Sequence, residues 1–315
     1  MRRCVYCDAL VNLQTVDAWD ADTAREAFVI LVCPACGCGG LAKPPSDSDL
    51  ARHYESSYYG LGTQKFLPVV QQLFDAGKRS LARAVIAALE GRDAPRVLDV
   101  GCGTGQLLLE LERLGAHATG LERAGGAARA VRPGLSILEG DLGDCAITPG
   151  TLDAIVIWHV LEHLRDPAVA IRVAADLLTP GGVLFLAVPN AASWQARVFG
   201  RYWFHLDVPR HLHFLTREGL EHMLDAGWLT ITRTGTLQFS QSVFGFIQSF
   251  FNAVLPSRPN RLYRLMRTPL GVATTAELVL WSAVACIVTP VAIVEALCSA
   301  LTGVGAIRIV VARKA

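Results

Sequence analysis

The stretch Val97-Leu98-Asp99-Val100-Gly101-Cys102-Gly103-Thr104-Gly105 is a short apolar strand that runs directly into a glycine-rich turn, after which a helix is predicted to begin. Glycine lets the backbone turn tightly and approach a ligand closely, and the free N–H groups of a helix N-terminus favour an anionic group. A dinucleotide-binding turn of the form G-x-G-x-x-G would place glycine at position 106, where this sequence has Gln106. Asp99 instead offers a carboxylate that can accept from the ammonium group of an amino-acid-like ligand.

Around this turn, residues 95–236 alternate apolar strands with helical stretches, the pattern of a parallel sheet wrapped by helices. The expected strands are 96–100, 118–122, 136–139, 152–157 and 182–188, with 228–234 as a sixth and 307–312 as the last. Glu122 ends the second strand, where a carboxylate can accept both hydroxyls of a ribose. Asp141 follows the third strand and can accept from an adenine amino group. We therefore expect a doubly wound α/β sheet with a ligand crevice at the carboxyl ends of its strands.

These residues resemble those of the class I methyltransferases that use S-adenosylmethionine (SAM). The matching segments are 97–105, Glu122, Glu139-Gly140-Asp141 and Leu178-Thr179-Pro180-Gly181-Gly182. The resemblance implies a Rossmann-like fold, SAM as the cofactor and transfer of its methyl group to an acceptor. It also implies cofactor contacts from Asp99, Gly101, Cys102, Gly103, Gly105, Glu122, Asp141, Leu142 and Trp158. A generic nucleotide-binding turn with ordinary strand-end acids is the alternative.

Three further segments are similar to one bacterial branch of this class, which includes ubiquinone-pathway O-methyltransferases and enzymes of cell-surface glycan clusters. They are Trp158-His159-Val160-Leu161-Glu162-His163-Leu164, residues 202–214 and residues 54–60. This branch acts on many acceptors, so the resemblance leaves the acceptor open.

The segments 158–163 and 202–213 carry five of the eight histidines of the chain, and both follow strand C-terminal ends. Their side chains are therefore expected near the methyl group of the cofactor. A hydroxyl acceptor must lose a proton, a task that suits a histidine with a pKa near neutral. The candidates for proton removal or acceptor positioning are His163, His211, His213 and Asp207. A structural hydrogen bond is the alternative role of each histidine, and Glu162 with His163 could also chelate a divalent metal.

Two C-x-x-C pairs stand in the N-terminal part of the chain, separated by 25 residues. Their cysteines are Cys4, Cys7, Cys33 and Cys36. Pairs of this kind resemble a zinc ribbon, in which four thiolates hold one structural Zn²⁺ in a tetrahedron. Cys38 follows Cys36 too closely to be a preferred ligand. Free or redox-active thiols are the alternative.

Residues 278–294 contain no charged side chain over 17 positions, which is barely enough to span a membrane of about 30 Å. Pro290 interrupts the run, and basic residues lie on both flanks. They are Arg258, Arg261, Arg264 and Arg267 before the run, and Arg308, Arg313 and Lys314 after it. Because 307–312 is expected to rejoin the sheet, a hairpin at the cytoplasmic face of a membrane is favoured over a span, with 243–255 as a further interfacial helix. A dimerisation hairpin buried against a second subunit is the alternative.

The composition limits the partners. Hydrophobic residues make up 52% of the 315 residues, and the formal net charge of +1 provides no basic field for a nucleic acid. No secretory signal is visible, which favours the cytoplasm. The expected segments are a zinc-ribbon-like part (1–45), a helical lead-in (46–94), a SAM-binding core (95–236), an apolar insertion (237–305) and a final strand of the core sheet (306–315).

The resulting functional hypothesis is SAM-dependent methyl transfer, to oxygen, on a membrane-proximal small-molecule, lipid-linked or glycan acceptor. A sugar C-methyltransferase is the rival enzyme, suggested by the ribbon. A non-catalytic SAM-binding scaffold is the rival from a different class, and the histidines at the reacting end argue against it.

Overall fold

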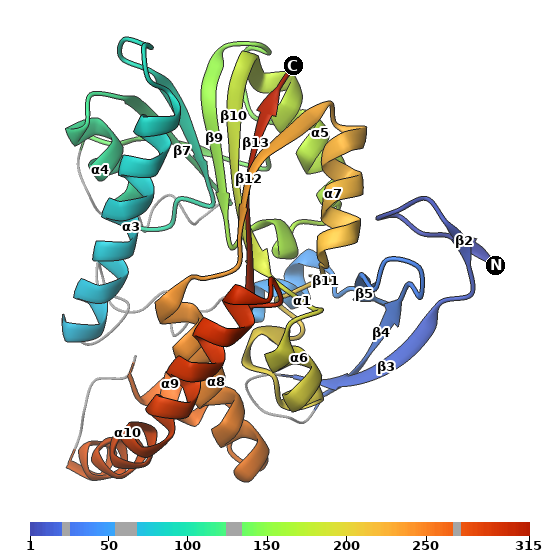
Figure 1. Ribbon diagram of the computed structural model, residues 1–315, viewed down its shortest axis with the longest axis vertical. Coiled ribbons are helices and arrows are strands. Elements are labelled where there is room, and N and C mark those ends of the chain that lie inside the picture. The colour runs from blue at the N-terminus through green and yellow to red at the C-terminus, as the bar shows by residue number, and fades with distance from the viewer. Residues whose placement is uncertain (21–25, 54–67, 124–133, 267–271) are drawn as a thin grey trace.

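The computed structural model describes residues 1–20, 26–53, 68–123, 134–266 and 272–315, and its centre is a seven-stranded sheet (Figure 1). The strand order is β12-β13-β10-β9-β6-β7-β8. The strands are β6 (Arg96–Val100), β7 (His117–Glu122), β8 (Ser136–Glu139), β9 (Leu152–Trp158), β10 (Leu178–Pro189), β12 (Leu229–Gly235) and β13 (Ile307–Lys314). Neighbours from β8 to β10 pair in parallel, whereas β13 runs antiparallel between β10 and β12. The predicted doubly wound sheet is confirmed, with β13 entering it after the long insertion.

Helices cover both faces of this sheet (Figure 1). Helices α3 (Pro68–Ala88) and α4 (Gln106–Arg113) pack on one face, and α5 (Pro167–Leu177) and α7 (Arg217–Ala226) pack on the other. Strands buried on both faces consist of nearly continuous apolar residues, which is why they were recognisable in the sequence. The carboxyl ends of the parallel strands remain as the edge where a ligand can bind.

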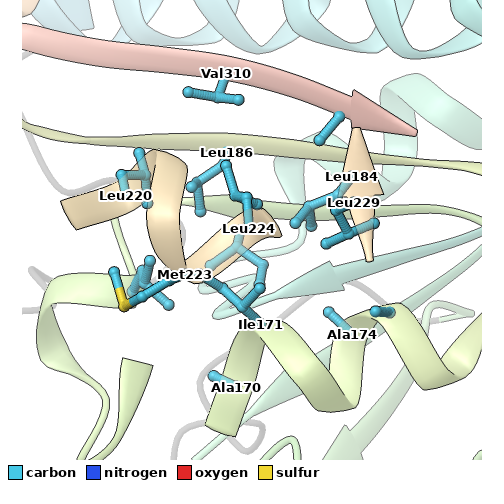
Figure 2. Packing of buried hydrophobic residues seen from close by; sticks show 14 of the residues in the cluster. Ala170, Ile171, Ala174, Leu184, Leu186, Leu220, Met223, Leu224, Leu229 and Val310 are labelled. Carbon is cyan, nitrogen blue, oxygen red and sulfur yellow. The ribbon is translucent and has the colours of Figure 1, made fainter. Parts of the chain in front are cut away.

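The layer between the sheet, α5 and α7 shows how tightly the core is filled (Figure 2). Ile171 of α5 and Leu224 of α7 meet Leu184 and Leu186 of β10, and each of the four is less than 1% exposed. Val310 extends the same layer from β13, so the last strand is part of the core. Burying such a side chain contributes about 1.5–3 kcal/mol to folding.

The N-terminal part forms two small antiparallel sheets. The elements are a hairpin of β1 (Arg2–Arg3) and β2 (Leu10–Val11), followed by β3 (Gln14–Trp19), β4 (Ala27–Val32) and β5 (Gly39–Leu41). The second sheet has a fourth strand, β11 (His213–Phe214), which comes from the central domain and pairs with β5. The ribbon-like segment is thus joined by backbone hydrogen bonds to the loop that carries the predicted histidines.

In the described residues of the insertion between β12 and β13, the chain forms three helices. They are α8 (Phe239–Val254), α9 (Arg261–Leu265) and α10 (Val272–Leu301). Phe251, Leu262 and Trp281 pack together in a small core of their own. The stretch Thr275–Leu301 of α10 is long and apolar enough to cross a membrane by length and composition, and only 22% of its most apolar 18 residues are buried. Pro290 lies inside this helix.

Short elements connect these parts. They are α1 (Asp47–Arg52), α6 (Trp194–Phe199) and the 3-10 turns η2 (Leu161–His163), η3 (Gly200–Tyr202) and η4 (Phe204–Leu206). The Ser46 hydroxyl accepts from the Asp49 N–H at 3.1 Å and so caps α1. Residues 54–60, part of the branch pattern, and Arg267 lie outside the described residues.

Candidate functional site

The loop after β6 has the backbone conformation that its glycines predict. Gly101, Gly103 and Gly105 have φ angles of 69°, 55° and 71°, in the left-handed region that favours glycine. A Cβ atom on Gly101 would lie 2.5 Å from Val160 Cγ2, whereas one on Gly103 would meet nothing within 4 Å. The loop is therefore packed against the protein at Gly101 and open toward ligand space at Gly103.

Asp99 provides a buried carboxylate at the base of this loop. Its side chain is 2% exposed, and among the described residues its Oδ2 atom has no hydrogen-bond partner. Burial raises the pKa of Asp99 to about 6. A buried carboxylate without a partner is costly, so a cationic group placed beside it would be stabilised. The ammonium group of SAM has that chemistry.

Glu122, at the end of β7, is held by the same loop. Its Oε2 atom accepts from the Gly103 N–H at 2.8 Å, and its Oε1 atom accepts from the Arg123 N–H at 3.1 Å. An ionised carboxylate has about four acceptor positions, so both oxygens can still accept from the hydroxyls of a ribose. The two backbone bonds orient the carboxylate before any ligand arrives.

The other predicted cofactor contacts differ in exposure. Asp141 is exposed after β8, Leu142 is buried beside it, and Trp158 is half-buried at the end of β9. Cys102 has a packing role, because a Cβ atom on Gly120 would lie 2.5 Å from its Sγ atom. The structure thus places acidic and aromatic groups at successive strand ends.

The predicted histidines His163 and His211 lie together beside Glu162. Their ring centroids are 4.6 Å apart, and one ligand atom from each of the three residues falls within 4.8 Å of the others. His163 Nδ1 donates to the Arg210 carbonyl and His211 Nδ1 donates to the His205 carbonyl, both at 2.8 Å. These bonds fix the tautomer in which each Nε2 atom keeps its lone pair. We call these three residues the Glu162 cluster.

The charge state of the Glu162 cluster follows from its burial. Glu162 is 1% exposed, and neither of its carboxylate oxygens has a hydrogen-bond partner in the described part of the chain. Burial opposes its ionisation, but His159, His163 and His211 around it bring the pKa of Glu162 down to about 2. Burial also lowers the pKa of His163 to about 4. The cluster therefore presents a carboxylate beside a neutral imidazole at neutral pH.

Asp207 adds a second carboxylate to this edge. It forms a bidentate ion pair with Arg210, and its Oδ2 atom lies 3.9 Å from His211 Nε2. Burial raises the pKa of Asp207, but the Arg210 guanidinium outweighs it and brings that pKa to about 2. Asp207 can stabilise a protonated His211 without itself taking the proton.

His213 has a different environment from the other predicted histidines. Its Nδ1 atom lies 2.7 Å from the hydroxyl of Tyr6, and its Nε2 atom lies 3.3 Å from the Arg165 carbonyl. The Tyr6 hydroxyl also reaches the Gly39 carbonyl at 2.8 Å. Partners thus stand at both ring nitrogens of His213, and its contact with Tyr6 links the ribbon to the strand next to His211.

Two more links were not visible in the sequence. His159 Nε2 donates to Gln238 Oε1 at 2.7 Å, which connects β9 to the start of the insertion. The Phe204 N–H donates to Ser249 Oγ at 2.8 Å, which connects η4 to α8. Both pairs are far apart along the chain, so no local pattern could have indicated them.

The four predicted zinc-binding cysteines lie at one point of the N-terminal part. The Sγ atoms of Cys4 and Cys36 are 3.8 Å apart, as are those of Cys7 and Cys33, and all four atoms lie within 4.8 Å of one another. A disulfide would need about 2.05 Å. Four sulfurs at about 2.3 Å from a central Zn²⁺ lie about 3.8 Å apart in a tetrahedron. The geometry of the four thiols therefore fits a structural zinc ion.

Comparison with known proteins identifies the family of the central domain. Residues 72–231 match the family model described as a methyltransferase domain. The chain belongs to the class I SAM-dependent methyltransferases. This methyltransferase is 31% identical over 212 residues to the ubiquinone biosynthesis O-methyltransferase of Xanthomonas campestris pv. campestris (strain B100), over 61% of this chain and 86% of the relative.

Solved structures add two similarities at lower identity. The methyltransferase is 21% identical to the [4+2]-cyclase SpnF, with a TM-score of 0.47, over 78% of this chain and 82% of that one. It is 14% identical to a SAM-dependent methyltransferase from Thermotoga maritima, with a TM-score of 0.46, over 84% of this chain and 96% of that one.

Proposed function

We propose that this methyltransferase transfers the methyl group of SAM to an oxygen atom of a membrane-proximal small molecule, lipid-linked or glycan acceptor. The observation that carries the proposal is the pair of Nε2 lone pairs on His163 and His211, held at the carboxyl end of β9 by backbone carbonyls. A hydroxyl acceptor needs a group that takes its proton, and a positioned imidazole supplies one. The similarity to a ubiquinone biosynthesis O-methyltransferase supports oxygen as the methylated atom.

In this proposal, Asp99 binds the ammonium group of SAM, Glu122 the ribose hydroxyls and Asp141 the adenine amino group. Gly101, Gly103 and Gly105 give the backbone close access to the cofactor, and Leu142 and Trp158 border it. His211 takes the proton of the acceptor hydroxyl, while Asp207 stabilises the resulting imidazolium. His163 positions the acceptor. Alignment of the acceptor with the methyl group can itself contribute about 7–11 kcal/mol to rate acceleration.

The Glu162 cluster supports an alternative to proton transfer by His211, because an Nε2 lone pair that coordinates a cation cannot also accept a proton. A buried ionised carboxylate without a hydrogen-bond donor calls for a cation, and both imidazoles present a lone pair beside it. In metal-binding histidines, the ring nitrogen that does not bind the metal commonly donates its N–H to a carbonyl. The Nδ1 atoms of His163 and His211 make this kind of bond. Glu162, His163 and His211 would hold a divalent cation that orients the acceptor oxygen and eases its deprotonation.

We also propose a structural Zn²⁺ held by Cys4, Cys7, Cys33 and Cys36. The 3.8 Å spacing of the sulfurs supports it. The ribbon would then hold β5 against β11 and so fix the segment 211–213 beside the Glu162 cluster. Sugar C-methylation, which the ribbon suggests, is the second candidate reaction, because the ribbon lies next to the reacting end.

Membrane attachment through the insertion completes the proposal. One face of α10 packs on α8 and α9, and large apolar side chains on the other face are exposed. They are Val279, Leu280, Ile287, Val291, Val294, Leu297 and Leu301, which we call the outer α10 face. Of the arginines expected to attract anionic lipids, Arg258 and Arg261 pair with Glu277 instead, so the apolar face is the stronger support.

Transfer of a labelled methyl group tests the function. Full-length enzyme is incubated with tritium-labelled SAM and membrane extracts of the source cells. We expect label in a lipid-soluble or glycan fraction, and analysis of the labelled product should identify a methyl ether. Label on carbon would instead support the second candidate, and absence of transfer to any fraction would refute the proposal.

A further inference from the structure

Three segments that are far apart in the sequence enclose a pocket of about 260 Å³. Trp19 and Asp20 come from the end of β3, Trp203 and Asp207 come from the η3–η4 region, and Asn252 and Asn260 come from the insertion. The ribbon and the insertion therefore build the pocket together, with the segment that follows β10 between them.

The pocket reaches the reacting end through Asp207. Asp207 lines the pocket, and its Oδ2 atom is 3.9 Å from His211 Nε2. A molecule bound in the pocket can thus extend one of its hydroxyls toward His211. The pocket is separate from the proposed cofactor site, because neither Asp99 nor Glu122 lines it.

The lining combines aromatic surface with fixed polar groups. Trp19 is 41% exposed on the pocket wall, and Tyr202 and Phe204 add further rings. The polar side is rigid, because Asn252 Nδ2 donates to the Tyr202 carbonyl at 3.3 Å and to Asn260 Oδ1 at 3.1 Å. A flat apolar wall beside a polar rim suits a ligand that has one apolar face and hydroxyls around its edge.

Trp203 supplies an independent sign that the pocket takes a ligand. Its side chain is 4% exposed, and its indole N–H is a buried donor with no partner in the described part of the chain. Buried donors are usually paired. A hydroxyl oxygen of a molecule bound in the pocket would accept the hydrogen bond that the Trp203 N–H does not make within the protein.

We infer that this pocket is the acceptor subsite and that it takes a sugar ring, which stacks on Trp19 and accepts a hydrogen bond from Trp203. A pyranose has a face of C–H groups and a rim of hydroxyls, and so matches both parts of the lining. A prenylated quinol has few hydroxyls at the edge of its ring and so matches only the aromatic part of the lining. The inference rests on the proposed function and narrows its acceptor to a glycan or a lipid-linked sugar.

Saturation-transfer NMR on the full chain with S-adenosylhomocysteine tests the inference. The probes are the methyl glycosides of rhamnose, fucose, mannose, glucose and N-acetylglucosamine, with catechol as the phenolic comparison. We expect saturation of ring protons in at least one glycoside. Trp19→Ala should weaken that binding about tenfold, and Trp203→Phe, which removes the N–H together with the pyrrole ring that carries it, should weaken it roughly two- to tenfold.

Trp228→Ala is the matched control, because Trp228 is 82% exposed and does not line the pocket. Trp203→Phe loses no intramolecular hydrogen bond but leaves a small cavity, so its melting temperature should fall, and binding is compared at a temperature at which both proteins are folded. The inference is overturned if no glycoside is saturated, if both pocket variants bind like the wild type, or if only catechol depends on Trp19. Methyl transfer into membrane extracts is measured separately, so a failure here with transfer intact leaves the proposed function standing.

Discussion

His211 Nε2 lies 3.9 Å from Glu162 Oε1, and no donor among the described residues hydrogen-bonds to either oxygen of that buried carboxylate. Burial lowers the pKa of His163, so this histidine is neutral at neutral pH and does not balance the negative charge of Glu162. This relationship separates two roles of the same histidines, because a proton acceptor works without metal whereas a cation-binding cluster does not.

Replacing Glu162 with Gln should abolish binding of a divalent cation at the Glu162 cluster while the fold persists. Mn²⁺ titrated into zinc-loaded protein should give one site by calorimetry, and Glu162→Gln should lose it. Methyl transfer should fall after treatment with a chelator that leaves the ribbon zinc in place, and should return with added Mg²⁺ or Mn²⁺.

Glu110→Gln is the control for this experiment, since Glu110 is also buried but pairs with Gln106 and Arg113. If Mn²⁺ binds to Glu162→Gln as it does to the wild type, or if chelation leaves turnover unchanged, the cluster acts through proton transfer alone.

Replacement of His211 or His163 by Ala should lower turnover more than it lowers SAM affinity. A positioned general base typically contributes about 10²–10⁴-fold, and neither histidine is among the proposed SAM contacts. Single-turnover methyl transfer and calorimetric SAM binding measure the two effects separately. His117→Ala, at an exposed position on β7, should leave both unchanged. Near-normal turnover of both site variants would place the base elsewhere.

Substitution of Asp99 with Ala should weaken SAM binding. Losing a hydrogen bond to a charged group costs about 1.5–3 kcal/mol, which is roughly ten- to a hundredfold in the dissociation constant. The same change removes a buried carboxylate without a partner, so the apo protein should not lose stability. Calorimetry and thermal unfolding of the same variant check both statements. Equal SAM affinity in the variant and the wild type would remove Asp99 from the cofactor site.

The purified protein should contain about one zinc ion per chain, and Cys36→Ser should lose it. Because β5 pairs with β11 beside His211, loss of zinc should lower methyl transfer while SAM binding persists. Metal analysis of freshly reduced protein gives the stoichiometry. Cys298→Ser, at an exposed position of α10, is the matched control. Protein that is folded and active but free of zinc would refute the ribbon proposal.

The parts of the fold that the sequence predicted are those with a local signal. Buried parallel strands are continuous apolar runs, and the loop 101–105 needs glycine at its left-handed positions. The strands β5 and β11 are only three and two residues long, so they carry no periodicity of their own. Their pairing exists only because the ribbon docks on the central domain.

The same reasoning applies to the site. The predicted cofactor residues follow strand ends, which a sequence reveals, whereas the contact of His213 with Tyr6 joins positions more than two hundred residues apart. Arg261 likewise forms an ion pair with Glu277, which neutralises one of the positive charges that the sequence places before the apolar run. The pocket around Trp19 joins three distant segments, and no single segment indicates it.

The outer α10 face should hold the enzyme at the cytoplasmic side of a membrane without a crossing. Seven large apolar side chains are exposed there, and burying them would contribute on the order of 10 kcal/mol at about 1.5 kcal/mol each. That amount exceeds the marginal binding of one myristoyl chain, so attachment should resist salt washing. Both ends of the insertion belong to the central sheet through β12 and β13, which a single crossing would separate.

Fractionation of cells that express the full chain measures attachment. The triple variant Leu280→Ser, Ile287→Ser, Val291→Ser should move into the soluble fraction, whereas Val198→Ser, at an exposed apolar position on α6, should stay with the membrane. If the face is instead a dimer interface, the wild type is soluble without detergent and the triple variant changes from dimer to monomer.

Cysteines at the exposed positions Ser257 and Ala315 then test the topology with an impermeant thiol reagent, in a background whose native thiols do not react. Neither should be labelled from outside intact cells, and labelling of only one of them would establish a crossing in place of surface attachment.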